Sequence, residues 1–198
     1  NGTTGTLGSG AVTNNGTLKV NRSNAITISN NISGTGELVV HNGDLTLSGV
    51  NTFTGNVTLN NASTLTIGSA TALFSGLNED TAGNLTLNGS SILDLGGHII
   101  YVGDFTQDGT SSVTGALGSK LVFKNANVKG GTFGISLASV DATDFIKETG
   151  STVTLSGDNS DFKGQIQLND GEIVLGNANA VTSSNDIVYP LVPTSVAT

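Results

Sequence analysis

Apolar and polar residues alternate one by one in many short stretches of this chain. The stretch GDLTLSGVNTFTGNVTLNNASTLTIG, from Gly43 to Gly68, shows the alternation repeatedly, with Thr, Ser or Asn between the apolar positions. Those apolar positions are Leu45, Leu47, Val57, Leu59, Leu65 and Ile67. A period of two is typical of β-strands with one buried face. The pattern therefore predicts short strands whose apolar side chains all face one interior.

Similar strand patterns recur along the rest of the chain. They lie at residues 17–20, 25–28, 37–40, 84–87, 92–95, 98–102, 120–123 and 134–137. Gly, Asn, Asp and Ser, which tolerate turns and left-handed backbone, separate them. No stretch has a sustained helical stripe, although GSATALFSG at 68–76 and GNANAV at 176–181 could each form a turn of helix. We therefore expect an all-β chain with tight connections.

The stretch from Gly43 to Gly68 has a second copy, GSTVTLSGDNSDFKGQIQLNDGEIVLG, from Gly150 to Gly176. Its apolar positions are Val153, Leu155, Ile166, Leu168, Ile173 and Leu175. The matched motif pairs are Gly49 with Gly157, Asn51 with Asn159 and, after one inserted residue, Phe53 with Phe162 and Gly55 with Gly164. Repeat-like copies over 32–73 and 150–181 indicate stacked structural repeats.

Composition favours a solenoid over a compact sandwich. Only 11% of the residues are charged, 5% are aromatic, and 28 residues are Gly. Parallel strands stacked about 4.8 Å apart place like side chains in columns, so columns of charge would repel each other. A β-sandwich and a disordered chain account less well for the long-range repeat and for apolar residues that are periodic. At about 20–25 residues a turn, we expect a parallel β-helix of about eight to ten turns.

The first copy also carries a recognisable motif. The chain over 32–73 resembles the autotransporter-associated β-strand repeat, found in passenger domains of Gram-negative autotransporters, and Gly49, Asn51, Phe53 and Gly55 occupy the motif's positions. In the second copy NSDFKG replaces NTFTG, and the less regular region 74–149 matches only in general style. The resemblance implies a right-handed parallel β-helix over residues 1–198, as a single segment of a longer passenger.

The resemblance is less specific for function, because passengers include adhesins, self-associating proteins, proteases, lipases and toxins. We expect a role in adhesion or cell–cell self-association, such as aggregation and biofilm formation. The partners would be an identical passenger on a neighbouring cell, or molecules of the host surface and matrix. The alternatives are a passive stalk or folding-promoting segment that presents a separate head, and a polysaccharide-active β-helical enzyme. The protein would lie outside the bacterial cell, released or tethered through an outer-membrane barrel beyond this segment.

No catalytic or metal-binding motif stands out. His41 lies in a predicted turn and His98 begins a predicted strand, and the chain has no Gly-x-Ser-x-Gly motif for a nucleophile. Acidic pairs, which we interpret as solvated loop charges, occur at Glu79–Asp80, Asp141–Asp144, Asp158–Asp161 and Asp170–Glu172. The loop SGDNSDFKG lacks the ligand spacing of known calcium loops. We therefore expect no enzymatic activity, no cofactor and no metal.

Charge, cysteine content and hydropathy bear on the possible partners and on the location of the protein. The net charge is −8, so a nucleic-acid backbone would be repelled overall and we expect no nucleic-acid partner. The chain has no cysteine, which suits export through an oxidising compartment but also suits the cytosol. No long apolar stretch occurs, so we do not expect this segment to insert into a membrane.

Basic residues gather in the least repeat-like part of the chain. Lys120, Lys124 and Lys129 lie close together in the sequence, with Lys147 further on, and departures from a repeat often carry specific function. These three lysines are candidate ligand contacts; the alternative is that they lie on different faces and do not act together. Near the end, IVYPLVP at 187–193 contains the only prolines of the chain. Because proline cannot donate to a strand ladder, we expect residues 187–198 to leave the repeat and cap or exit the helix.

Overall fold

The computed structural model of the chain describes residues 2–139, 144–181 and 187–188. All regular secondary structure in this part of the chain is β-strand. The strands are β1 (Val12–Thr13), β2 (Thr17–Asn21), β3 (Ile26–Ile28), β4 (Ile32–Ser33), β5 (Glu37–Asn42), β6 (Asp44–Leu47), β7 (Val57–Leu59), β8 (Thr64–Ile67), β9 (Leu85–Leu87), β10 (Ile92–Asp94), β11 (Ile99–Gln107), β12 (Ser112–Thr114), β13 (Lys120–Val128), β14 (Gly131–Phe133), β15 (Ser136–Ala138), β16 (Asp144–Lys147), β17 (Thr152–Leu155), β18 (Gln165–Leu168), β19 (Glu172–Leu175) and β20 (Ile187–Val188).

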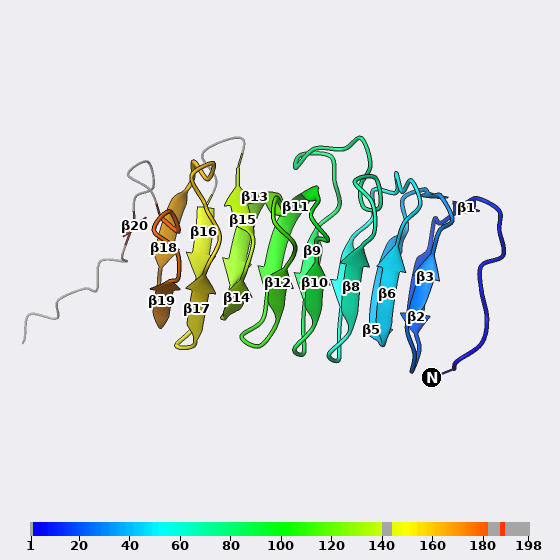
Figure 1. Cartoon of the computed structure of the whole chain (residues 1–198), viewed down its shortest axis with the longest axis horizontal. Helices are drawn as coiled ribbons and strands as arrows, with labels where there is room; N and C mark the ends of the chain where they lie inside the picture. The colour runs from blue at the N-terminus through cyan, green and yellow to red at the C-terminus, as the bar shows by residue number, and fades with distance from the viewer. Residues whose placement is uncertain (1, 140–143, 182–186, 189–198) are drawn as a thin grey trace, which may run out of the picture.

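These strands stack in parallel as a β-solenoid of about eight turns, which forms a rod (Figure 1). One sheet contains β2, β5, β7, β9, β11, β13, β16, β18 and β20 in spatial order, and a second contains β3, β6, β8, β10, β12, β14, β17 and β19. The third face is less continuous: it begins with β1 and β4, and later consists of the first halves of β11 and β13 with β15. The predicted all-β parallel helix is confirmed.

The register between neighbouring turns fixes the repeat length. Leu45 pairs with Leu65, and Leu93 pairs with Val113, so each of these turns takes 20 residues. Leu65 pairs with Leu93, so the turn between them takes 28 residues. The extra length forms the loop between β8 and β9, which rises above the strands in Figure 1. This loop, residues 68–84, is called the insertion loop below.

The inward side chains of successive turns stack into continuous columns. One column of the second sheet runs through Leu45, Leu65, Leu93, Val113, Phe133 and Leu155, and all of these are buried. In the later turns the packing becomes aromatic, because the ring centroid of Phe133 lies 5.8 Å from those of both Phe105 and Phe145. Each fully buried Leu or Phe contributes about 1.5–3 kcal/mol through removal from water. The core is therefore one apolar stack along the rod.

The predicted interior residues of the first copy are all buried, as are Val153, Leu155 and Ile166 of the second. Leu168 and Ile173 are only partly buried, and Leu175 is 50% exposed, so its predicted burial is wrong. The reason is position: β19 is the last strand of its sheet within the described residues, so no further turn covers Leu175.

The structure also differs from two other expectations, those for the possible helical turns and for the C-terminal cap. Residues 68–76 and 176–181 form bends and turns instead of helical turns, because their apolar side chains, such as Leu73 and Ala180, are drawn individually into the core. At the C-terminal end, β20 continues the first sheet by pairing with β18. The remainder of the predicted cap, including Pro190 and Pro193, lies outside the described residues.

Candidate functional site

The repeat-motif asparagines act as buried connectors between turns. Asn51 is fully buried; its Oδ1 accepts the N–H of Ile32 at 2.9 Å and its Nδ2 donates to the carbonyl of Ala72 at 2.7 Å. Each bond reaches a different neighbouring turn. A carboxamide carries both a donor and an acceptor, so one side chain satisfies a backbone N–H of one turn and a backbone carbonyl of another.

Asn159 makes the equivalent contacts in the second copy. Its Oδ1 accepts the N–H of Leu137 at 2.8 Å, and its Nδ2 donates to the carbonyl of Ala180 at 2.8 Å. The sequence offset thus identified residues with the same structural role. Both polar groups of the Asn159 side chain therefore form hydrogen bonds within the protein.

The glycines and phenylalanines of the motif are structural too. A Cβ on Gly49 would lie 2.1 Å from the carbonyl oxygen of Asn30, and a Cβ on Gly157 would lie 1.8 Å from that of Ile135. Gly55 has the same constraint against Gly36. The remaining motif residues are Phe53, which packs on Phe74, Phe162, which packs on Phe123, and Gly164, which is buried. The motif therefore builds the turn and offers little to a ligand.

The outer faces display columns of small polar side chains. On the first sheet Thr58, Thr86 and Thr106 stack in register on β7, β9 and β11, and each is half-buried. On the second sheet a similar column runs through Thr27, Thr46, Thr66, Asp94 and Thr114. Hydroxyl groups at a repeat of about 4.8 Å offer donors and acceptors along the length of the rod.

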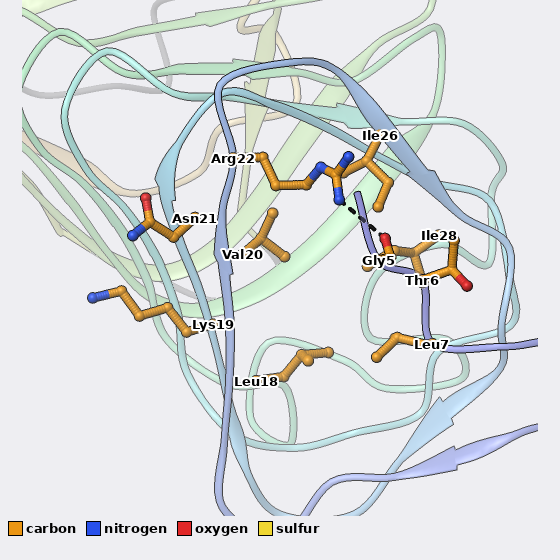
Figure 2. A pocket seen from close by; sticks show the side chains of 10 residues that line it. All are labelled: Gly5, Thr6, Leu7, Leu18, Lys19, Val20, Asn21, Arg22, Ile26 and Ile28. Atoms are coloured by element: carbon orange, nitrogen blue, oxygen red, sulfur yellow. Dashed lines mark hydrogen bonds between the residues drawn. The ribbon is translucent and has the colours of Figure 1, made fainter. Parts of the chain in front are cut away.

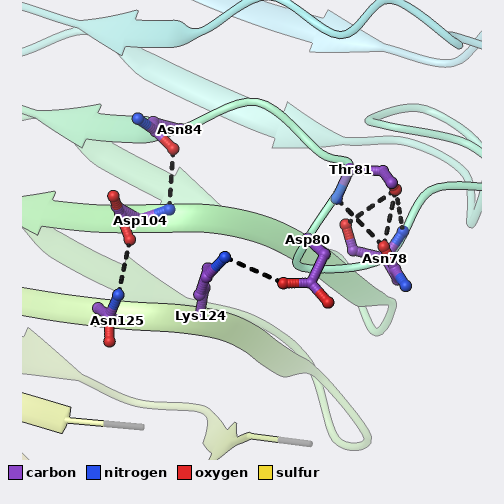
Figure 3. Close-up of polar contacts among 7 residues, drawn as sticks. All are labelled: Asn78, Asp80, Thr81, Asn84, Asp104, Lys124 and Asn125. Carbon is purple, nitrogen blue, oxygen red and sulfur yellow. Dashed lines mark hydrogen bonds and ion pairs between the residues drawn. The ribbon is translucent and has the colours of Figure 1, made fainter.

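A second kind of column consists of exposed amides and carboxylates (Figure 3). Asn84 donates its N–H to Oδ1 of Asn56 at 3.1 Å, and its own Oδ1 accepts the N–H of Asp104 at 2.9 Å. Oδ1 of Asp104 accepts Nδ2 of Asn125 at 3.0 Å. The bonds link four successive turns, so these side chains are held in place along the corner where the chain enters the first sheet.

The insertion loop folds back against this corner of the solenoid. Phe74 anchors it in the core with its ring centroid 5.3 Å from that of Phe53. At its far end the hydroxyl of Thr81 donates to Oδ1 of Asn78 at 2.7 Å and closes a turn. Asp80 pairs there with Lys124 at 3.1 Å (Figure 3). Glu79 beside it is only 7% exposed, so the interpretation of this acidic pair as solvated is wrong for Glu79.

The candidate lysines lie at three different points of β13 and its exit. Lys120 begins the strand on the third face and forms an ion pair with Asp161. Lys124 lies at the corner between two faces and pairs with the insertion loop. Lys129 is exposed just after the strand. The structure therefore does not bring the three ammonium groups together, although Lys120 joins a different cluster.

That cluster surrounds a hollow of about 270 Å³ on the third face. Ile99 and Tyr101, 47% and 37% exposed, form one wall, while Lys120, Asp161 and Lys163 form the polar side. We call it the third-face hollow. One signal in the sequence points to this hollow, the strand pattern at 98–102, but that pattern does not reveal which side of the strand stays uncovered.

Two polar side chains replace apolar ones inside the core. Gln107 and Lys147 occupy the inward column that also holds Leu87, Val128 and Leu168. Lys147 donates through Nζ to the carbonyls of Thr149 and Asp170, the latter at 3.1 Å. Burial lowers the pKa of the Lys147 ammonium, and the charge of Asp170 partly opposes this.

At the N-terminal end, the first turn leaves a second hollow, of about 280 Å³ (Figure 2). The inward side chains Leu18, Val20, Ile26 and Ile28 line it, and the segment that contains Leu7 crosses over it. Arg22 holds this segment by donating to the carbonyls of residues 3, 4 and 5, the last two at 3.0 Å. A strap, residues 2–8, therefore lies over this hollow and is held by Arg22.

The remaining candidates show no assembled chemical site. His41 lies within β5, with Nε2 3.1 Å from Nδ2 of Asn61, so it is not in a turn as predicted; His98 directly precedes β11. Within the described residues, no three His, Cys, Asp or Glu side chains are grouped to hold a metal ion. None of the described segments forms a helix long and apolar enough to cross a membrane.

The chain was compared with protein-family models, with curated proteins and with solved structures, and none of the three comparisons yields a match.

Proposed function

We propose that this β-solenoid is a segment of a bacterial surface passenger protein that acts in adhesion or cell–cell self-association. The observation that carries the proposal is the outer surface: in-register columns of Thr, Asn and Asp repeat along the sheets of a rod. The motif resemblance over 32–73 adds the secretion class. Neither the surface columns nor the motif resemblance identifies a particular ligand.

Such a surface suits weak contacts in large numbers. A single hydrogen bond contributes only about 0.5–1.5 kcal/mol net, because each group also bonds to water. Many parallel bonds between rods, and many rods on each cell, give a high effective concentration for the second and later contacts. Each copy carries a net charge of −8, so two copies repel each other overall, but the Thr58, Thr86 and Thr106 column itself is uncharged and physiological salt screens charges more than about 8 Å away.

The test compares cells that display the protein containing this segment with cells from which residues 1–198 have been deleted. Surface display is measured with an antibody to a tag outside the segment. The proposal predicts that deletion abolishes clumping and attachment to host cells at equal display. If both persist, adhesion by this segment is refuted and the passive-stalk alternative takes its place.

Column variants refine the same assay. Changing Thr58, Thr86 and Thr106 together to Ala removes one hydroxyl column, whereas Thr86→Ala alone is the matched single change. We expect the triple variant to reduce clumping strongly and the single variant to leave it nearly unchanged, since the contacts are individually weak. Adhesion carried instead by Lys120, Lys124 or Lys129 would weaken as salt is raised and after single charge reversals.

A further inference from the structure

The third-face hollow combines an apolar wall with a polar rim on one side of the rod. On the third face Tyr101 pairs in register with Val122, which pairs in turn with Ala138. The side chains along this outward column become smaller at each turn. Val122 and Ala138 are only 4% and 6% exposed and form the floor, so the decrease in size produces a step at Tyr101.

The rim supplies hydrogen-bonding groups of both kinds. Lys120 forms its ion pair with Asp161 on the polar side of the hollow, although Asp161 keeps 62% of its side chain exposed. Lys163 lines the same side, and its backbone N–H is fixed by Oγ of Ser139 at 3.1 Å. Ammonium groups donate and a carboxylate accepts, so the rim can bind hydroxyl groups in either sense.

We propose that the third-face hollow binds a sugar ring of a cell-surface or matrix glycan. A pyranose has a face of C–H groups, which suits the exposed ring of Tyr101 beside Ile99, and an edge of hydroxyls, which suits Lys120, Asp161 and Lys163. The volume of about 270 Å³ fits one or two rings. Its eight lining residues are too few for a standard protein interface, which takes about 20–30 residues on each partner.

This proposal rests on the proposed adhesive function, to which it adds a ligand class. A ligand with about a dozen heavy atoms reaches a dissociation constant on the order of millimolar. Such a site acts through avidity between many rods and many sugars. The hollow lies on a different face from the threonine columns of the two long sheets, so the two kinds of contact can be separated by mutation.

The test uses the full chain labelled with 3-fluorotyrosine and carrying Tyr189→Phe. The chain has two tyrosines, so this variant leaves Tyr101 as the single fluorinated residue. Its fluorine NMR signal is titrated separately with glucose, galactose, mannose, N-acetylglucosamine and N-acetylneuraminic acid, with open-chain sorbitol as the control. We expect a saturable shift with at least one ring sugar and none with sorbitol.

Variants then locate the binding. Asp161→Asn and Lys163→Ala are exposed changes that should weaken binding about tenfold, while Lys124→Ala, on β13 outside the hollow, should not change it. The proposal is overturned if no sugar gives a saturable shift, if sorbitol binds equally, or if the rim variants titrate like Lys124→Ala. A shift that instead follows protein concentration assigns the hollow to contacts between copies, and also overturns it. Negative titrations with clumping intact leave the adhesive function standing.

Discussion

Replacing the buried connector Asn51 with Ala should destabilise the solenoid far more than replacing an exposed asparagine. The change leaves the N–H of Ile32 and the carbonyl of Ala72 without their hydrogen-bond partner. Asn51 binds these groups at 2.9 and 2.7 Å, and its side chain has no exposure to solvent. Each buried backbone group left without a partner costs about 1–3 kcal/mol. The expected loss is therefore roughly 2–6 kcal/mol, a large part of the total stability of a typical domain.

Urea unfolding followed by far-ultraviolet circular dichroism measures this loss. The matched control is Asn125→Ala: Asn125 also bonds a neighbouring turn, through Asp104 at 3.0 Å, but it is exposed, so water can replace the bond and the cost should stay below about 1 kcal/mol. Asn159→Ala should match Asn51→Ala within about 1 kcal/mol, because its bonds are equivalent. Equal losses for Asn51→Ala and Asn125→Ala would refute the connector role.

Three further outcomes follow from the structure. Lys147→Met should cost less than about 2 kcal/mol, since an apolar side chain suits the inward column although the carbonyls of Thr149 and Asp170 lose a donor. Because the pKa of Lys147 is lowered on folding, the natural chain should gain stability as pH rises from that lowered value towards 10.5, and the variant should not. A larger loss in urea unfolding, or the same pH dependence in both chains, would contradict this. Burial raises the pKa of Asp108, but hydrogen bonds from the Ser111 hydroxyl and nearby backbone N–H groups outweigh burial, and the pKa is lowered. The stability that Asp108 contributes should therefore be present above about pH 4 and be lost as the pH falls further. Asp108→Asn should remove this contribution in acid titrations of unfolding. Arg22→Gln should release the strap and speed amide hydrogen exchange at Ser23, whose N–H donates to the carbonyl of Gly2 at 3.4 Å, whereas Lys19→Ala should not. Unchanged exchange at Ser23 would show that Arg22 does not hold the strap.

Alternation and repetition predicted the fold because both are local consequences of burial. A side chain such as Leu45 or Leu65 faces inward in every turn, so the period of two survives in the sequence. The motif positions Asn51 and Asn159 were likewise found by matching copies, and their contacts prove equivalent. What the sequence could not supply was the hydrogen bonding that makes these positions structural.

The stacking register was beyond the sequence. Alignment of the copies matches Leu45 with Val153, yet the column that passes through Leu45 reaches Leu155, because the turn from Phe133 to Leu155 takes 22 residues. Small changes in turn length shift the columns without disturbing the alternation. The sequence likewise showed the insertion loop only as a possible helical turn.

The third-face hollow was also out of reach. Lys120 and Asp161 are 41 residues apart in the chain and meet only because the stack places them on the same face two turns apart. The exposure of Tyr101 depends on the smaller Val122 and Ala138 in the next turns. Only the spatial order of the turns shows which outward residue stands beside which.

The most direct test of the account is whether the chain alone makes inert particles stick. Beads coated with the full chain at known density are mixed with each other and with host cells, and clusters and attachments are counted against beads coated with the Thr58, Thr86 and Thr106 triple variant. The account predicts clustering or attachment with the natural chain and a strong reduction with the triple variant at equal density and equal melting temperature. Beads that stay dispersed and unattached with the natural, folded chain would contradict it.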